Sequence, residues 1–116
     1  MASDNCLFCG IVKGEVPADV LLRTEKSVAF GDINPQAPVH FLVIPATHID
    51  NAGTVEAADS EAVCDLLTTA QRVAQDHGIA ETGYRLVFNV GQDACNTVAH
   101  LHLHVLGGRG MTWPPG

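Results

Sequence analysis

The stretch His100-Leu101-His102-Leu103-His104-Val105-Leu106 alternates imidazole and aliphatic side chains. Successive side chains of a β-strand point to opposite faces, so this pattern predicts a strand over residues 98–106 with three histidines in a row on one face. The aliphatic side chains on the other face would anchor that strand in the core. At about 3.3 Å per residue the outer histidines would lie about 13 Å apart, too far to bind one metal together. We therefore expect different roles for the three histidines; the alternative is a solvated strand face that is merely rich in histidine.

Outward from this stretch, the sequence predicts an α+β fold with an antiparallel sheet, one main helix and a short N-terminal helix. Apolar positions at helical spacing predict the main helix between Asp59 and Gly78, with Asp59 or Ser60 as its cap. The apolar run 40–44, ended by Pro45, is typical of a central strand covered on both faces. The other expected elements are a short helix near residues 6–12, a hairpin of strands 20–22 and 28–30, and a strand over residues 84–90.

The composition predicts one soluble domain over residues 1–116. Hydrophobic residues make up 47% of the chain, and no window approaches the roughly 18 apolar residues of a membrane helix. The first residues carry no basic segment followed by a long apolar run, so we expect no secretory signal and a cytoplasmic location. A net charge of -7 with only six Lys and Arg argues against nucleic acid as a partner. A small phosphate ligand stays open, because backbone N–H groups, histidines and small polar side chains can hold it.

The middle histidine, His102, is best placed to act as a nucleophile. A neutral imidazole attacks well near pH 7, because its unperturbed pKa is about 6.5 and a hydrogen bond to one ring nitrogen leaves the other free. His100 and His104 can then hold phosphate oxygens, orient His102 or bind a metal. His40, which begins a facing strand, can supply a further hydrogen bond. Attack at phosphorus requires no metal here, since fixed donors can stabilise the transition state electrostatically.

The histidine run resembles the His-φ-His-φ-His-φ-φ signature of the histidine triad superfamily, in which φ is an apolar residue. The segments 30–45 and 106–109, together with Trp113-Pro114-Pro115-Gly116, resemble its nucleoside phosphoramidase branch, the Hint-type proteins, and the similarity covers nearly the whole chain. The resemblance implies a homodimer that hydrolyses purine nucleoside phosphoramidates or aminoacyl adenylates to the nucleoside monophosphate. It also implies a covalent nucleotidyl-histidine intermediate on His102.

The same resemblance implies roles for residues outside the run. His104 and His40 would support the phosphate and the nucleophile, and Asp32 would hold the ribose hydroxyls. Asn89 and Thr97 would lie near the phosphate and leaving group. The base pocket would be lined by Leu7, Phe8, Phe30 and Ile33. The alternative is that these four apolar residues are ordinary core residues. Thr97 stands where the branch often has Ser, which keeps the hydroxyl. The loop 90–96 is not the branch's commonest version, so the leaving-group preference stays open.

The cysteines, Cys6, Cys9, Cys64 and Cys95, are expected as reduced thiols or metal ligands rather than disulfides. Taken alone, the pair in Cys6-Leu7-Phe8-Cys9 is a weak metal signal, and two inert buried residues are the alternative. Several bacterial members of the resembled superfamily hold a tetrahedral zinc with such a pair, the histidine that ends the segment 44–48, and the first triad histidine. Those residues here are Cys6, Cys9, His48 and His100. The resemblance thus implies one structural zinc per chain, which contributes to stability and not to bond breaking.

Two further functions stay open. A dinucleoside polyphosphate hydrolase or phosphorylase would share the histidine nucleophile and differ in leaving group, although Gly107-Gly108-Arg109 and the C-terminal Trp-Pro-Pro-Gly favour the phosphoramidase. A related nucleotidyltransferase branch has Gln in place of the last triad histidine, and His104 argues against it. The chain could also be a nucleotide-sensing interaction module with incidental hydrolysis. In the expected homodimer, the tail around Trp113 could reach the substrate pocket of the partner.

Overall fold

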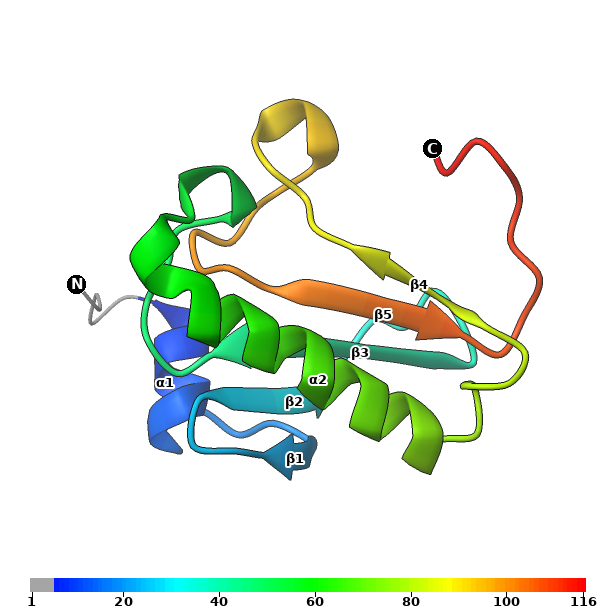
Figure 1. The fold of residues 1–116 in the computed structure, drawn as a ribbon, viewed down its shortest axis with the longest axis horizontal. Coiled ribbons are helices and arrows are strands. Elements are labelled where there is room, and N and C mark those ends of the chain that lie inside the picture. Colours follow the sequence, from blue (N-terminus) through cyan, green and yellow to red (C-terminus); the bar gives the residue numbers. More distant parts are fainter. Residues whose placement is uncertain (1–5) are drawn as a thin grey trace.

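The computed structural model describes residues 6–116; residues 1–5, on which the expectation of no secretory signal depends, lie outside the described residues. The fold is α+β, as the sequence predicts, with a five-stranded antiparallel sheet in the order β1-β2-β3-β5-β4 (Figure 1). The strands are β1 (Val20–Arg23), β2 (Ser27–Gly31), β3 (Val39–Pro45), β4 (Tyr84–Val87) and β5 (Leu103–Gly107). The helices are α1 (Leu7–Lys13) and α2 (Ser60–Asp76), with 3-10 turns at Ala52–Thr54, Ala57–Asp59 and Gln92–Ala94.

The two faces of the sheet carry two separate cores. On one face α2 crosses β2 and β3 (Figure 1), and its Leu66 and Val73 pack in one cluster with strand residues such as Val43. On the opposite face α1 packs Phe8 and Ile11 against the alternate residues of β2 and β3. Strand β3 is therefore apolar on both sides, which explains the uninterrupted run at 40–44.

The short helix α1 holds the cysteine pair at its start. Cys6 is the N-cap, and its Sγ accepts a hydrogen bond from the N–H of Cys9 at 3.3 Å. Gly14 ends the helix with φ 77°, a left-handed conformation that costs glycine little. Both thiols consequently lie within the first turn of α1, on the face that carries the second core.

The histidine run enters its strand later than the alternation predicts. Strand β5 begins at Leu103, so His100 and His102 precede it, and the expectation of one regular strand over 98–106 was wrong. The reason lies in β3: Pro45 has no N–H to continue the ladder, and the N–H of Leu101 donates instead to Ile49 O at 2.6 Å. The alternation of faces survives, because Leu101 and Leu103 are both buried in the core under α2.

Two other boundaries differ from expectation. Strand β4 ends at Val87 rather than at residue 90, and its last pair is Val87 with His104. Asp59 does occupy the N-cap of α2, but its carboxylate accepts the N–H of Glu56 instead of capping α2. Within residues 6–116 no helix has the length and apolarity needed to cross a bilayer.

Candidate functional site

A cavity of about 810 Å³ opens on the face of the sheet that carries α1. Its lining includes every predicted substrate-binding residue and three of the four predicted catalytic histidines: Leu7, Phe8, Phe30, Asp32, Ile33, His40, Asn89, Thr97, His102 and His104. The fourth, His100, is fully buried and is not part of the lining. No Lys or Arg from residues 6–116 lines the cavity, so a phosphate bound there would be held by imidazole, amide and hydroxyl groups.

His102 presents one ring nitrogen to the cavity. Its Nδ1 lies 2.8 Å from the backbone oxygen of His100, and because a carbonyl only accepts, the ring proton is on Nδ1. Nε2 then carries a lone pair, and no residue between 6 and 116 offers it a hydrogen bond. Phe8 of α1 packs edge-on against the ring, with centroids 5.2 Å apart. The ring is thus held in the tautomer that a nucleophile needs.

His40 and His104 form a chain of hydrogen bonds beside His102. The backbone N–H of Gln36 donates to His40 Nδ1 at 3.0 Å, so neutral His40 has its proton on Nε2. That nitrogen lies 3.0 Å from His104 Nδ1, which must therefore accept. His104 consequently keeps its own proton on Nε2, a donor available to a ligand in the cavity. The ring centroids of His102 and His104 lie 5.1 Å apart, so the ring with a free lone pair and the ring with an available N–H are neighbours in the cavity.

Burial keeps these imidazoles neutral. It lowers the pKa of His104 to about 4, and the charges that protonated His102 and His40 would carry lower it further, whereas Asp32 opposes the shift. Burial also lowers the pKa of His40, again against the opposing effect of Asp32. Each ring therefore carries a single proton near pH 7, as the chain of hydrogen bonds requires.

Asp32 lines the cavity, but part of its carboxylate is already engaged. Oδ1 accepts the N–H of Asn34 at 2.8 Å, and Oδ2 lies 3.3 Å from His40 Nε2. Together with His104, these side chains bring three possible metal ligands within 4.8 Å of one another. A metal on His40 Nε2 would have to displace the ring proton while Nδ1 still accepts from Gln36, which would make the ring an imidazolate. We therefore interpret this group as a hydrogen-bonded cluster rather than a metal site.

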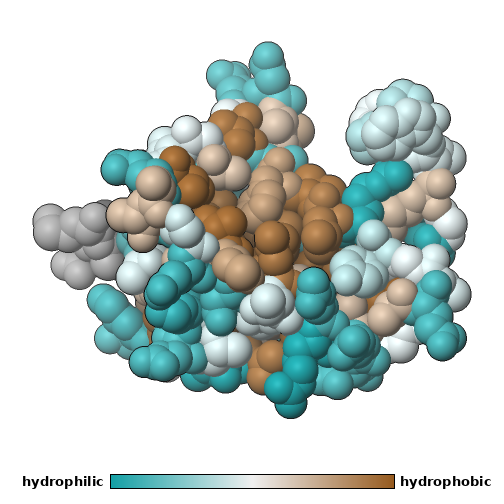
Figure 2. Space-filling view, in the orientation of Figure 1, coloured by the Kyte–Doolittle hydropathy of each residue, from teal (hydrophilic) through white to brown (hydrophobic). Residues whose placement is uncertain are grey.

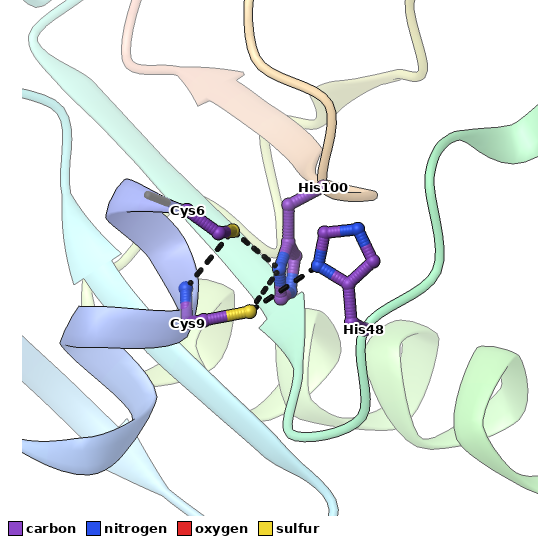
Figure 3. A group of neighbouring side chains, drawn as sticks. All are labelled: Cys6, Cys9, His48 and His100. Atoms are coloured by element: carbon purple, nitrogen blue, oxygen red, sulfur yellow. Dashed lines mark hydrogen bonds between the residues drawn. The ribbon is translucent and has the colours of Figure 1, made fainter. Parts of the chain in front are cut away.

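A second cluster lies at the start of α1, and it contains the four predicted zinc ligands. Cys6 Sγ lies 3.3 Å from His100 Nδ1, and Cys9 Sγ lies 3.4 Å from the same nitrogen and 3.2 Å from His48 Nδ1. Figure 3 shows the two thiols of the helix and the two rings pointing toward one another. All four donor atoms lie within 4.8 Å. The structure thus joins residues separated by more than ninety positions in one group.

The outer nitrogens of the two rings fit this cluster to zinc. His100 Nε2 lies 3.1 Å from Pro45 O, and His48 Nε2 lies 3.0 Å from an oxygen of Asp50. Both partners are acceptors, so both rings are protonated on Nε2 and turn the lone pair of Nδ1 toward the thiols. An imidazole whose far N–H is held by a carbonyl or a carboxylate is the usual arrangement around protein zinc, and two Cys with two His form a common structural set.

His100 contributes to both the thiol cluster and the catalytic cavity. Its ring lies in the thiol cluster, and its backbone oxygen fixes the tautomer of His102. Orienting His102 was one of three roles that the sequence left open for the side chain of His100. The sequence could not indicate the backbone oxygen, because every residue has one. Sequence reasoning also missed Gln36 and the contact between Asp32 and His40. The latter was within reach: Gly31 pairs with Phe41, so the next residues outward, Asp32 and His40, face each other.

Comparison with known proteins gives consistent matches. The HIT domain matches residues 13–111. A 14 kDa zinc-binding protein of Zea mays is 46% identical over 95% of this chain and 87% of its own length. The crystal structure of a HIT family hydrolase from Legionella pneumophila superposes with a TM-score of 0.94 and 52% identity, covering 97% of this chain and all of that one. A HIT family hydrolase from Clostridium thermocellum superposes with a TM-score of 0.92 and 45% identity over 96% of each chain.

Proposed function

This chain belongs to the HIT family, a family of nucleotide hydrolases and transferases, and from that premise we propose that it hydrolyses purine nucleoside phosphoramidates or aminoacyl adenylates to the nucleoside monophosphate. The observation that carries the proposal is the free Nε2 of His102, held in the cavity beside the N–H of His104. This pairing suits attack at a phosphorus atom whose oxygens need a donor.

The reaction we propose has two displacements. In the first, the lone pair of His102 Nε2 forms a bond to the α-phosphorus, and the bond from phosphorus to the amine or the aminoacyl carboxylate breaks with its electron pair. A departing amine takes a proton from solvent, which the water of the second displacement returns. The N–H of His104 donates to a phosphate oxygen as negative charge gathers there. In the second, water attacks the same phosphorus, loses a proton, and releases the nucleoside monophosphate and His102. Splitting one difficult displacement into two is the advantage of covalent catalysis.

The rest of the cavity supports a nucleoside as the bound portion. Phe8, Phe30 and Leu7 offer apolar surface for a purine, and Ile33 at the rim is fully exposed. We propose that Asp32 receives the ribose hydroxyls through lone pairs left by its contacts with Asn34 and His40. Asn89 and Thr97 line the same cavity as His102, and we propose that they face the phosphate and leaving group.

Substitution of the nucleophile tests this mechanism. We expect His102→Ala to lower turnover of an adenosine phosphoramidate by at least about a thousandfold, because the attacking atom is gone. The Kd for AMP, measured by calorimetry, should change little, since the base and ribose contacts remain. Rapid-quench mass spectrometry of the wild type should find the nucleotidyl group on His102. Turnover within a few-fold of wild type in the variant, or direct single-step attack by water, would rule the mechanism out.

A substrate panel separates the alternatives. Faster cleavage of phosphoramidates than of dinucleoside polyphosphates supports the proposal, and the reverse order would assign the chain to polyphosphate cleavage. AMP binding without turnover of either class would leave a nucleotide-sensing module. The free N–H of His104 favours an enzyme, because it places a donor where charge develops in the reaction.

We also propose that Cys6, Cys9, His48 and His100 hold one structural zinc. The support is the convergence of four suitable donor atoms and the engagement of both outer ring nitrogens. The metal would supply a closed four-ligand link between α1 and the sheet, and no step of the reaction uses it. The zinc-binding relative of maize agrees with this assignment.

Finally, we propose a homodimer that pairs through β4. Within residues 6–116 this strand has a partner on one side only, and its Leu86 is 44% exposed on the face shared with Val105 of β5. Val90, which follows β4, and Leu67, which lies in α2, add exposed apolar surface. Figure 2 shows apolar side chains gathered above α2. An unpaired edge beside an apolar face is a surface that a second copy can cover.

A further inference from the structure

Gly107-Gly108-Arg109 and the loop at Gln36 have no role in the proposed mechanism, yet Arg109 contacts the loop and the loop contacts His40. The N–H of Gln36 is the donor that makes His40 Nδ1 an acceptor. Through His40 this one backbone group also decides which nitrogen of His104 carries the proton. The position of the Gln36 N–H therefore controls whether His104 offers the cavity a donor or a lone pair.

Arg109 holds Gln36 from its other side. The Nε and Nη2 atoms of Arg109 each donate to Gln36 O at 3.2 Å, and its Nη1 donates to Gly110 O at 3.1 Å. A planar guanidinium that donates through two nitrogens to one oxygen fixes direction as well as distance. Residue 36 is thus held by His40 at its amide and by Arg109 at its carbonyl.

The two glycines allow this contact. A side chain at Gly107 would lie 2.8 Å from Ile79 Cδ1, and one at Gly108 would lie 3.0 Å from Pro38 Cβ. Gly108 also has φ 88°, a conformation that other residues rarely adopt. The chain can therefore leave β5, pass close over Pro38 and place Arg109 against the loop.

We propose that Arg109 is a positioning residue: by fixing the carbonyl of Gln36 it keeps the Gln36 N–H on His40, and so keeps His104 as a donor toward the cavity. Arg109 touches neither the reacting atoms nor His104 itself. Its kinetic consequence rests on the proposed function, whereas its effect on the ring protons does not.

The direct test is the proton position on the two rings. Long-range proton–nitrogen NMR of ring-labelled protein should show wild-type His40 and His104 each protonated on Nε2 alone. In Arg109→Ala both rings should show a mixture of tautomers, and the Gln36 amide should exchange faster with solvent. Arg109→Lys, which keeps one donor, should show an intermediate mixture. Arg85 is the matched control: it is also an arginine that donates to a carbonyl of the C-terminal segment, Thr112 O at 3.0 Å, and Arg85→Ala should leave the tautomers unchanged.

Kinetics provide the second readout. We expect kcat for an adenosine phosphoramidate to fall about five- to tenfold in Arg109→Ala with little change in KM, the size that follows from weakening one charge-assisted hydrogen bond. Arg109→Lys should recover part of the loss. Unchanged tautomers and amide exchange in Arg109→Ala would overturn the proposal, as would equal effects in Arg85→Ala. If the wild type shows the expected tautomers but no turnover, the proposed function fails while the role of Arg109 stands.

Discussion

The buried imidazole of His104 couples stability to acidity at the scale of a single residue. Its pKa is about 4 in the folded chain, against about 6.5 for an imidazole in an unfolded one. Between these values the unfolded chain binds a proton that the folded chain does not. The contribution of His104 to stability is therefore complete above pH 6.5 and is lost as the pH falls toward 4.

We expect His104→Gln to flatten the pH dependence of the free energy of unfolding between pH 4 and 6.5. The change in slope is at most about 1.4 kcal/mol per pH unit, the limit for one titrating group. Urea denaturation at several pH values measures it for both proteins. Parallel curves for wild type and variant would show that His104 releases no proton on folding.

Side-chain chemistry at single residues could be predicted from the sequence, whereas backbone chemistry could not. The histidine run indicated a nucleophile with neighbours of different function, and the structure places His102 and His104 in one cavity with His100 behind them. The atoms that set the ring tautomers are the carbonyl of His100 and the amide of Gln36. Every residue has a carbonyl and almost every residue has an amide N–H, so a pattern of residue types cannot indicate which of these groups contacts a histidine ring.

At the scale of elements, periodicity predicted the type of each element better than its limits. The alternation around Leu103 gave the buried face of β5 correctly, but where the ladder ends depends on Pro45 and Ile49, more than fifty residues away. Helix α2 was easier, because its spacing is a local property and Ser60 begins it within the predicted bounds.

The turn at Gln92–Ala94 ends in a strained residue that lines the cavity. Cys95 has φ 61°, the left-handed region in which a residue with a Cβ is disfavoured. We expect Cys95→Gly to raise the free energy of unfolding by up to about 1 kcal/mol. Relief of the backbone strain at residue 95 should outweigh the larger conformational entropy that glycine gives the unfolded chain. Urea denaturation checks this. Cys95→Ala, which removes the thiol and keeps the strain, should show no such gain; an equal gain would assign the effect to the thiol.

The attachment of α1 to the sheet predicts a metal-dependent stability. Cys6→Ser/Cys9→Ser should contain no zinc by elemental analysis and should melt on the order of 10 °C below the wild type, which should carry close to one zinc per chain. Serine is a good N-cap, so α1 keeps its cap at residue 6 and the loss reports on the cluster. Cys64→Ser, at an exposed cysteine outside the cluster, is the control. Wild type without zinc after refolding with excess metal would dismiss the site.

At the scale of the whole molecule, the two edges of the sheet differ. Leu86 on β4 and Val20 on β1 are similarly exposed, at 44% and 42%, but the chain that continues from β4 also carries Val90, which is 45% exposed. We expect Leu86→Lys to give a monomer and Val20→Lys to leave a dimer, as measured by sedimentation velocity at micromolar concentration. A monomeric wild type would refute the dimer, and a monomer from Val20→Lys alone would move the interface to β1.

His100 contributes to two sites with different groups, and this affects how the sequence can change during evolution. Its ring serves the thiol cluster, but its service to His102 is performed by a carbonyl oxygen, which any amino acid at position 100 would bring. A lineage could therefore lose the cysteines and the first histidine together and still inherit the tautomer of its nucleophile. The cluster and the catalytic cavity also share α1, whose Phe8 packs against His102, so such a lineage would need another way to hold that helix.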